Sequence, residues 1–133
     1  MKHSCLINGY DSLNLTKLDV LDDLAEIKVA VKYTVNGEEL PGFPGSCKSL
    51  CYQFRIFDNV YLAADLGVLA TVDVSYVTLP GWQFPITSIT SFDALPENCK
   101  RYIAFIENFL GVPIEWIGVG PERESMLKKP LLK

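Results

Sequence analysis

The sequence predicts an α/β fold in which short strands alternate with helical segments. Stretches with a period of two lie near both ends of the chain, and a long amphipathic helical pattern precedes the last of them. A length of 133 residues suits one compact domain, and an apolar share of 49% is enough for a real core. We therefore expect a single unit, residues 1–133, with a strand-loop-helix element, a hairpin, a helix and a strand in that order.

The first expected element is a strand followed by a loop and a short helix. Residues 12–16 alternate polar and apolar side chains, as a short strand does. Val20, Leu21 and Leu24 then have helical spacing, and Asp19 stands where it could cap the first turn of a helix.

A β-hairpin is expected over residues 26–40. Apolar residues alternate there with charged or small ones, and Asn36-Gly37 is the strongest short-range hairpin signal because both residues tolerate positive φ. A further strand is expected at residues 72–77, and the segment 79–82 would close it as a turn.

The clearest helix in the sequence covers residues 96–110. Pro96 suits the first helical turn, and Gly111 stands where a C-terminal cap is needed. Between them runs an apolar stripe of Tyr102, Ile103, Phe105, Ile106, Phe109 and Leu110. A last strand is expected at residues 114–119, followed by a charged tail.

Composition argues against several classes of partner. The formal net charge is -4, and the scattered Lys and Arg residues form no basic stripe for nucleic acid. The longest apolar runs, residues 68–72 and 114–119, are far shorter than the roughly 20 residues that a membrane span requires. The N-terminal residues include no apolar stretch of signal-peptide length. We expect a cytoplasmic protein with no nucleic-acid or membrane partner.

The cysteines do not have the spacing of a metal site. Cys5, Cys47, Cys51 and Cys99 include no C-x-x-C pair, and the only histidine, His3, lies two residues from Cys5. We expect free thiols in a reducing compartment and no metal ligands.

A loop with the sequence Thr16-Lys17-Leu18-Asp19 has the residue types that a guanine base requires. It follows the first expected strand, and ligands of open α/β sheets bind at the carboxyl ends of strands. Guanine presents N1-H and its N2 amine side by side, and an ionised carboxylate can accept both hydrogens. The lysine stem can lie over the ring. The N-K-x-D element of small GTPases has the same Lys-x-Asp spacing. A solvated loop with an N-capping aspartate is the alternative.

A second candidate loop, Gly118-Val119-Gly120-Pro121, follows the last expected strand. Glycine lets a backbone approach a flat ligand closely because no Cβ intrudes. A plain turn at the end of a strand is the alternative.

Taken together, these segments resemble adenylosuccinate synthetase over most of the chain. The matching stretches are Ile7-Asn8-Gly9-Tyr10, Leu13-Asn14-Leu15-Thr16-Lys17-Leu18-Asp19-Val20-Leu21-Asp22, Thr78-Leu79-Pro80-Gly81-Trp82, Leu95-Pro96-Glu97-Asn98, Trp116-Ile117-Gly118-Val119-Gly120-Pro121 and Arg123-Glu124-Ser125-Met126. In that family the Thr-Lys-Leu-Asp and Gly-Val-Gly loops contact the guanine of GTP. The resemblance thus assigns base binding to Lys17, Leu18, Asp19, Gly118, Val119, Gly120 and Pro121.

The resemblance also implies what this sequence lacks. The family joins IMP to L-aspartate with GTP and Mg²⁺, through 6-phosphoryl-IMP, and commonly works as a homodimer. Its Gly-Asp-Glu-Gly-Lys-Gly-Lys phosphate loop, which carries the catalytic aspartate, does not occur here, and His3 matches no part of the catalytic-histidine motif. We therefore expect the last quarter of a larger mixed-sheet GTP-binding ligase, with no catalytic residue and with the Mg²⁺ ligands in the absent N-terminal part. The alternative is a non-catalytic relic or binding fragment, or an incomplete gene model, without activity of its own.

One segment, residues 45–63, departs from the family pattern, because family members pass directly between its flanks. It could be an inserted hairpin, since Tyr52, Phe54 and Ile56 alternate as in a strand. It could also be translated non-coding sequence, which we favour because the segment is rich in aromatics and has no evident partner surface.

Deleting residues 45–63 is expected to leave stability unchanged, because a segment without a partner surface adds nothing to the core and loop length costs little. The measurement is the urea midpoint of a chain joined from Pro44 to Ala64 beside that of the intact chain. A clearly lower midpoint for the shortened chain would make the segment an integrated structural element.

Overall fold

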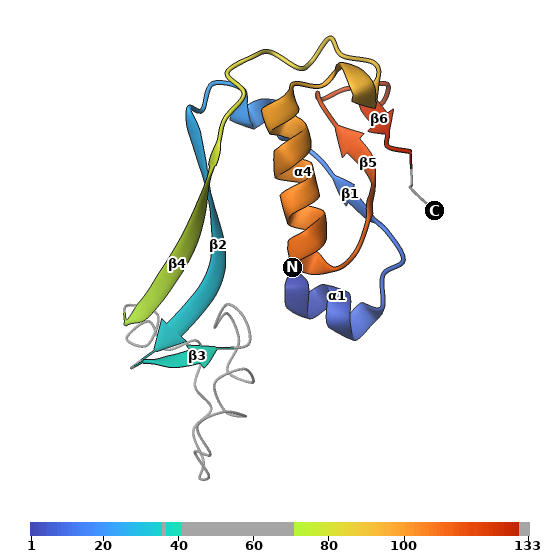
Figure 1. Cartoon of the computed structure of the whole chain (residues 1–133). Coiled ribbons are helices and arrows are strands. Elements are labelled where there is room, and N and C mark those ends of the chain that lie inside the picture. Colours follow the sequence, from blue (N-terminus) through green and yellow to red (C-terminus); the bar gives the residue numbers. More distant parts are fainter. Residues whose placement is uncertain (36, 41–70, 131–133) are drawn as a thin grey trace. The chain divides into compact units, whose positions relative to one another are not determined.

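The computed structural model describes residues 1–35, 37–40 and 71–130. The chain divides into two compact units, one formed by Met1–Ile27 with Thr78–Lys133 and the other by Lys28–Val77 (Figure 1). The unmatched segment 45–63 lies outside the described residues, so both interpretations of it remain predictions.

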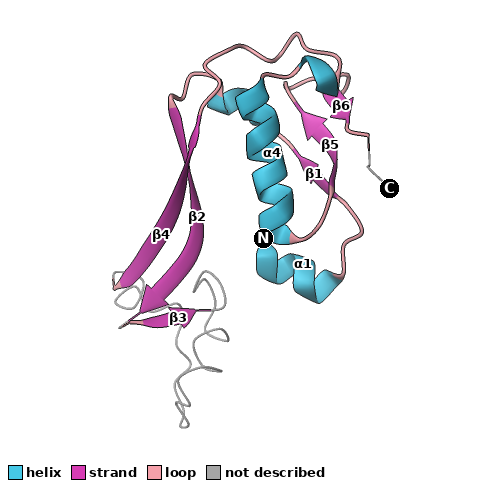
Figure 2. Ribbon diagram, viewed as in Figure 1, coloured by secondary structure: helices cyan, strands magenta, loops and turns pink. Residues whose placement is uncertain are grey.

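The first unit contains a mixed sheet of three strands, which confirms the predicted α/β class. Its order is β1 (Leu13–Leu15), β5 (Ile114–Gly118) and β6 (Met126–Lys128). Figure 2 shows the sheet beside the helices of this unit. Strand β1 runs parallel to β5, whereas β6 runs antiparallel to it. The predicted strands at residues 12–16 and 114–119 are thus confirmed and lie next to each other.

Long-range contacts hold β1 against β5. The N–H of Leu13 donates to the carbonyl of Pro113 at 2.8 Å, and the Ser12 hydroxyl donates to the Glu115 carboxylate at 3.2 Å. The register skips one residue between Leu13 and Asn14, after which Leu15 stands opposite Ile117. Both strands therefore end at the same edge of the sheet.

Helix α4 (Glu97–Leu110) confirms the predicted long helix within one residue of its expected start. Pro96 is the N-cap residue, and Gly111 ends the helix in the left-handed conformation with φ of 71°. Its apolar stripe buries Cys99, Ile103 and Leu110 completely or almost so. A short first helix, α1 (Lys2–Asn8), was not predicted, and it ends at Gly9 with φ of 60°.

Two predictions for the first unit were wrong. Residues after β1 form a single 3₁₀ turn, η1 (Leu18–Leu21), whose N-cap residue is Lys17 and not Asp19, and no side chain caps it. Residues 126–128, expected in a charged tail, form β6 because they pair with β5. A second 3₁₀ turn, η2 (Phe92–Ala94), precedes α4.

The predicted hairpin is confirmed in the second sheet. Strands β2 (Glu26–Val35) and β3 (Glu38–Leu40) pair antiparallel, and Gly37 has φ of 84° at the turn. The third strand, β4 (Val72–Pro80), pairs on the other side of β2 and runs three residues beyond its predicted end.

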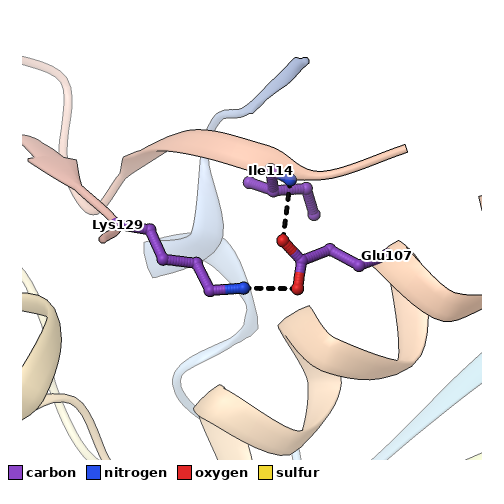
Figure 3. A network of polar contacts seen from close by, with 3 residues as sticks. All are labelled: Glu107, Ile114 and Lys129. Carbon is purple, nitrogen blue, oxygen red and sulfur yellow. Dashed lines mark hydrogen bonds and ion pairs between the residues drawn. The ribbon is translucent and has the colours of Figure 1, made fainter. Parts of the chain in front are cut away.

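A charged pair joins α4 to the two strands that follow it. The Glu107 carboxylate accepts a hydrogen bond from the N–H of Ile114 at 2.7 Å and pairs with the ammonium of Lys129 (Figure 3). Both side chains are less than one-fifth exposed, so each charge needs the other. The pair thus fixes the start of β5 and the end of β6 to the last turns of the helix.

Stability is expected to fall above pH 9 because of Cys99. Burial raises the pKa of its thiol from 9.0 to about 12, and the nearby Asp22 charge adds to the rise. Between these two pKa values the folded state keeps the proton while the unfolded chain releases it. The contribution of this thiol to the free energy of unfolding is therefore fully present below pH 9 and is lost as pH rises toward 12. Burial also raises the pKa of Tyr102, which adds to the loss above pH 10.

Urea midpoints at pH 7.5, 9 and 10.5, in the intact chain and in Cys99→Ala, measure this effect. Cys99→Ala should have a lower urea midpoint than the intact chain at neutral pH, because the substitution leaves a small cavity. Its midpoint should fall less than that of the intact chain between pH 7.5 and pH 10.5. Parallel pH curves for the two proteins would assign the alkaline loss to other groups.

Candidate functional site

The two loops singled out in the sequence meet at the carboxyl ends of β1 and β5. A Cβ atom placed on Gly118 would lie 3.3 Å from the Cα of Thr16 and 3.6 Å from the backbone nitrogen of Lys17. Such closeness favours glycine, because a side chain here would need Thr16 to move by a few tenths of an ångström. Loops at adjacent parallel strand ends form the usual position of a ligand site in an α/β sheet.

Lys17 has a backbone conformation that non-glycine residues seldom adopt. Its φ of 60° and ψ of 40° place it in the left-handed region, at a cost of about 1–2 kcal/mol. Leu18, only 1% exposed, anchors the next residue in the core. Lys17 itself is exposed, and its backbone nitrogen lies close to Gly118. Strain of this kind clusters at ligand sites, because surrounding structure must maintain it.

The predicted site residues differ in what they can offer a ligand. Lys17 and Pro121 are exposed, whereas Asp19 and Gly120 are half-buried. Leu18 and Val119 are 1% and 0% exposed, so their side chains belong to the core and only their backbone atoms could reach a ligand. The N–H of Val119 already donates to the carbonyl of Ser125 at 2.9 Å. Gly118 is buried against Thr16 and Met126.

Within the described part of the chain, the carboxylate of Asp19 has no hydrogen-bond or ion-pair partner. A half-buried carboxylate with both oxygens available can accept two donors from one ligand. This is the chemical capacity that the sequence analysis required of Asp19.

Two further side chains border the glycine loop. A Cβ atom on Gly120 would lie 3.0 Å from the Ser125 hydroxyl oxygen and 3.9 Å from the Cγ2 methyl of Thr87. Sequence reasoning assigned no role to either residue. Ser125 could have been suspected because it lies in a stretch that matches the family, but nothing in the local sequence marks Thr87.

Asp22 was also missed, although it organises the loop that carries Thr87. Its carboxylate accepts hydrogen bonds from the indole N–H of Trp82 at 2.7 Å and from the backbone N–H of Ile86 at 3.0 Å. The signal was a tryptophan in an expected turn, since a buried indole N–H usually requires an acceptor.

Outside the two loops, the described residues border an open hollow near the end of α4. Among them, no group of three or more His, Cys, Asp and Glu side chains could hold a metal ion, and no helix is long and apolar enough to cross a membrane. The hollow, of about 360 Å³, is lined by Glu107 and Lys129, and none of the predicted ligand residues borders it.

Comparison with known proteins supports one family. The family model described as adenylosuccinate synthetase matches residues 1–127. "Adenylosuccinate synthetase 1" of Laccaria bicolor is 60% identical over 131 residues, which are 98% of this chain and 26% of that protein. The enzyme of Coprinopsis cinerea is 57% identical over 129 residues, again 26% of its length. The chain therefore spans about a quarter of these relatives.

A solved structure gives the same result. The chain is similar to a structure described as fully ligated adenylosuccinate synthetase from Plasmodium falciparum, with a TM-score of 0.75 and 34% sequence identity. The match covers 97% of this chain and 27% of that one. The resemblance that the motifs suggested is thereby confirmed.

Proposed function

Because the chain belongs to the adenylosuccinate synthetase family, we propose that it is the part of such an enzyme that holds the guanine of GTP. The observation that carries this proposal is the contact between the Thr16–Lys17 backbone and Gly118, at the ends of two adjacent parallel strands. The contact brings together the Thr16–Asp19 loop and the Gly118–Pro121 loop, to which the family resemblance assigns binding of the same base.

Each residue then has a distinct task in base recognition. Asp19 accepts the N1-H and N2 amine hydrogens of guanine, and the stem of Lys17 covers one face of the ring. Gly118 and Gly120 let the backbone approach the base, and Pro121 limits the loop at the site's edge. Leu18 and Val119 hold the two loops to the core through side chains that are 1% and 0% exposed.

The complete enzyme would convert IMP, L-aspartate and GTP into adenylosuccinate, GDP and phosphate. The family uses GTP and Mg²⁺, and we propose that the phosphate-binding, metal-binding and catalytic groups stand in the three quarters of the relatives that this chain does not span. A cytoplasmic homodimer is the form expected of the complete protein.

The chain alone is expected to show no synthetase activity. Acceleration of phosphoryl transfer comes mainly from charges and Mg²⁺ placed around the γ-phosphate, and binding one base supplies neither. The purified chain is assayed with IMP, GTP, Mg²⁺ and aspartate for adenylosuccinate. Product above the background of a heat-denatured control would refute the expectation.

Asp19→Asn is expected to shift base preference from GTP toward xanthosine triphosphate. Guanine has an amine donor at C2, whereas neutral xanthine has a carbonyl acceptor there. The side-chain NH₂ of an asparagine at position 19 would face the guanine amine donor to donor, but it would donate to the xanthine carbonyl. Losing a charge-assisted hydrogen bond costs about 1.5–3 kcal/mol and an unsatisfied donor adds about 1–3. Together they predict a loss on the order of 10²-fold or more in kcat/KM for GTP.

This test uses a chimera in which the chain replaces the matching quarter of the Laccaria bicolor enzyme, with which it is 60% identical. The kcat/KM values for both nucleotides are compared in the parent chimera, Asp19→Asn and the matched control Asp23→Asn, since Asp23 is exposed. An unchanged nucleotide ratio in Asp19→Asn would remove Asp19 from the guanine site.

A further inference from the structure

Asp22 lies between the η1 turn, which carries Asp19, and the loop before α4, which contains Trp82 and Ile86. We propose that Asp22 is a positioning residue for the guanine site, one that holds Asp19 and Thr87 in place without touching the nucleotide. This inference rests on the proposed function, because it concerns the orientation of the carboxylate that reads the base.

The hydrogen bonds of Asp22 connect both sides of this junction. Its backbone N–H donates to the carbonyl of Asp19 at 3.1 Å, which closes the η1 turn. Its side chain accepts from Trp82 with one oxygen, at 2.7 Å, and from Ile86 with the other, at 3.0 Å. Main chain and side chain of one residue thus join the turn to the loop.

The loop side of this junction is firmly held. Ile86 is 0% exposed and Trp82 is 8% exposed, with its ring centroid 6.1 Å from that of Tyr102 in α4. The side-chain amide of Asn98 donates to the carbonyl of Gly81 at 2.8 Å, and the N–H of Gly81 donates to Ala25 at 2.8 Å. The loop can therefore act as a fixed support.

The turn side, in contrast, has few attachments of its own. Helix η1 is four residues long, and its Val20 side chain is 67% exposed. Leu18 anchors the first residue of the turn, and Asp22 anchors its end. Asp19 lies between these two anchors, so the direction of its carboxylate depends on both.

An aspartate suits this position better than an asparagine. Two N–H donors face the side chain, and a carboxylate offers an acceptor oxygen to each, whereas an amide offers one oxygen and one NH₂. In Asp22→Asn, the side-chain NH₂ would face either the indole N–H or the backbone N–H of Ile86, so that two donors would meet without an acceptor. The turn, which has fewer attachments than the loop, would then shift, and Asp19 would lose its fixed orientation relative to Thr87.

The test is made in the same Laccaria bicolor chimera, with Asp22→Asn and its neighbour Asp23→Asn as the matched control. Loss of one hydrogen bond to a charged group predicts a rise on the order of tenfold in KM for GTP. The kcat at saturating GTP and the KM values for IMP and aspartate should stay within about twofold, because a positioning role affects the guanine end alone. Asp23→Asn should match the parent.

A second variant separates positioning from general damage to the fold. Trp82→Phe removes the indole donor. In the double variant with Asp22→Asn, the side-chain NH₂ at position 22 therefore no longer faces an indole N–H. Part of the lost GTP affinity should then return relative to Asp22→Asn alone, a coupling that independent structural defects would not produce. If Asp22→Asn does not yield folded enzyme, Trp82→Phe alone should still raise KM for GTP and leave KM for IMP unchanged.

Three outcomes have different meanings. A normal KM for GTP in Asp22→Asn, or an equal rise in the KM values for GTP and IMP, would overturn the positioning role. If Asp19→Asn alters nucleotide preference while Asp22→Asn does not, this inference fails and the proposed function stands. If neither variant alters the use of GTP, the guanine site itself has been misplaced and both proposals fall.

Discussion

Within the larger unit, two hydrogen bonds that the Asp22 carboxylate accepts hold the η1 turn against the loop before α4. They join a short 3₁₀ turn, which could not persist alone, to a loop anchored on α4 through Trp82. A partly buried charge is tolerated there because both of its oxygens are satisfied. The same residue joins the turn that carries Asp19 to the loop that carries Thr87, whose methyl group lies close to Gly120.

The sequence predicted the elements that local signals specify. Helix α4 has a proline at its start, a glycine at its end and a buried stripe, and the β2–β3 hairpin has Asn36-Gly37. The elements missed are those whose form comes from distant contacts. Strand β6 has three residues, too few to show a period, and exists because β5 lies beside it. Val20, Leu21 and Leu24 have helical spacing, which predicts a capped helix where the structure has the η1 turn.

The sequence named candidate site residues but not how their side chains are buried. Motif spacing named Lys17, Asp19 and the glycine loop as candidates, but it could not show that the side chains of Leu18 and Val119 fill the core. Thr87 reaches the site through tertiary contacts alone. Asp22 and Asp23 are chemically identical neighbours, and the positions of Trp82 and of the Ile86 N–H distinguish the anchored carboxylate from the exposed one.

The pairing of β1 with β5 has a consequence for how the protein is made. Ser12 and Glu115, which hydrogen-bond at this junction, are 103 residues apart in the chain. Contacts of such separation require a large loop to close before they return any energy, so they form late in folding. During synthesis, the Thr16–Asp19 turn leaves the ribosome long before the glycine loop exists to meet it. A nascent chain can therefore form α1 and the β2–β3 hairpin early, yet its two candidate loops cannot meet until residues 114–120 have been synthesised.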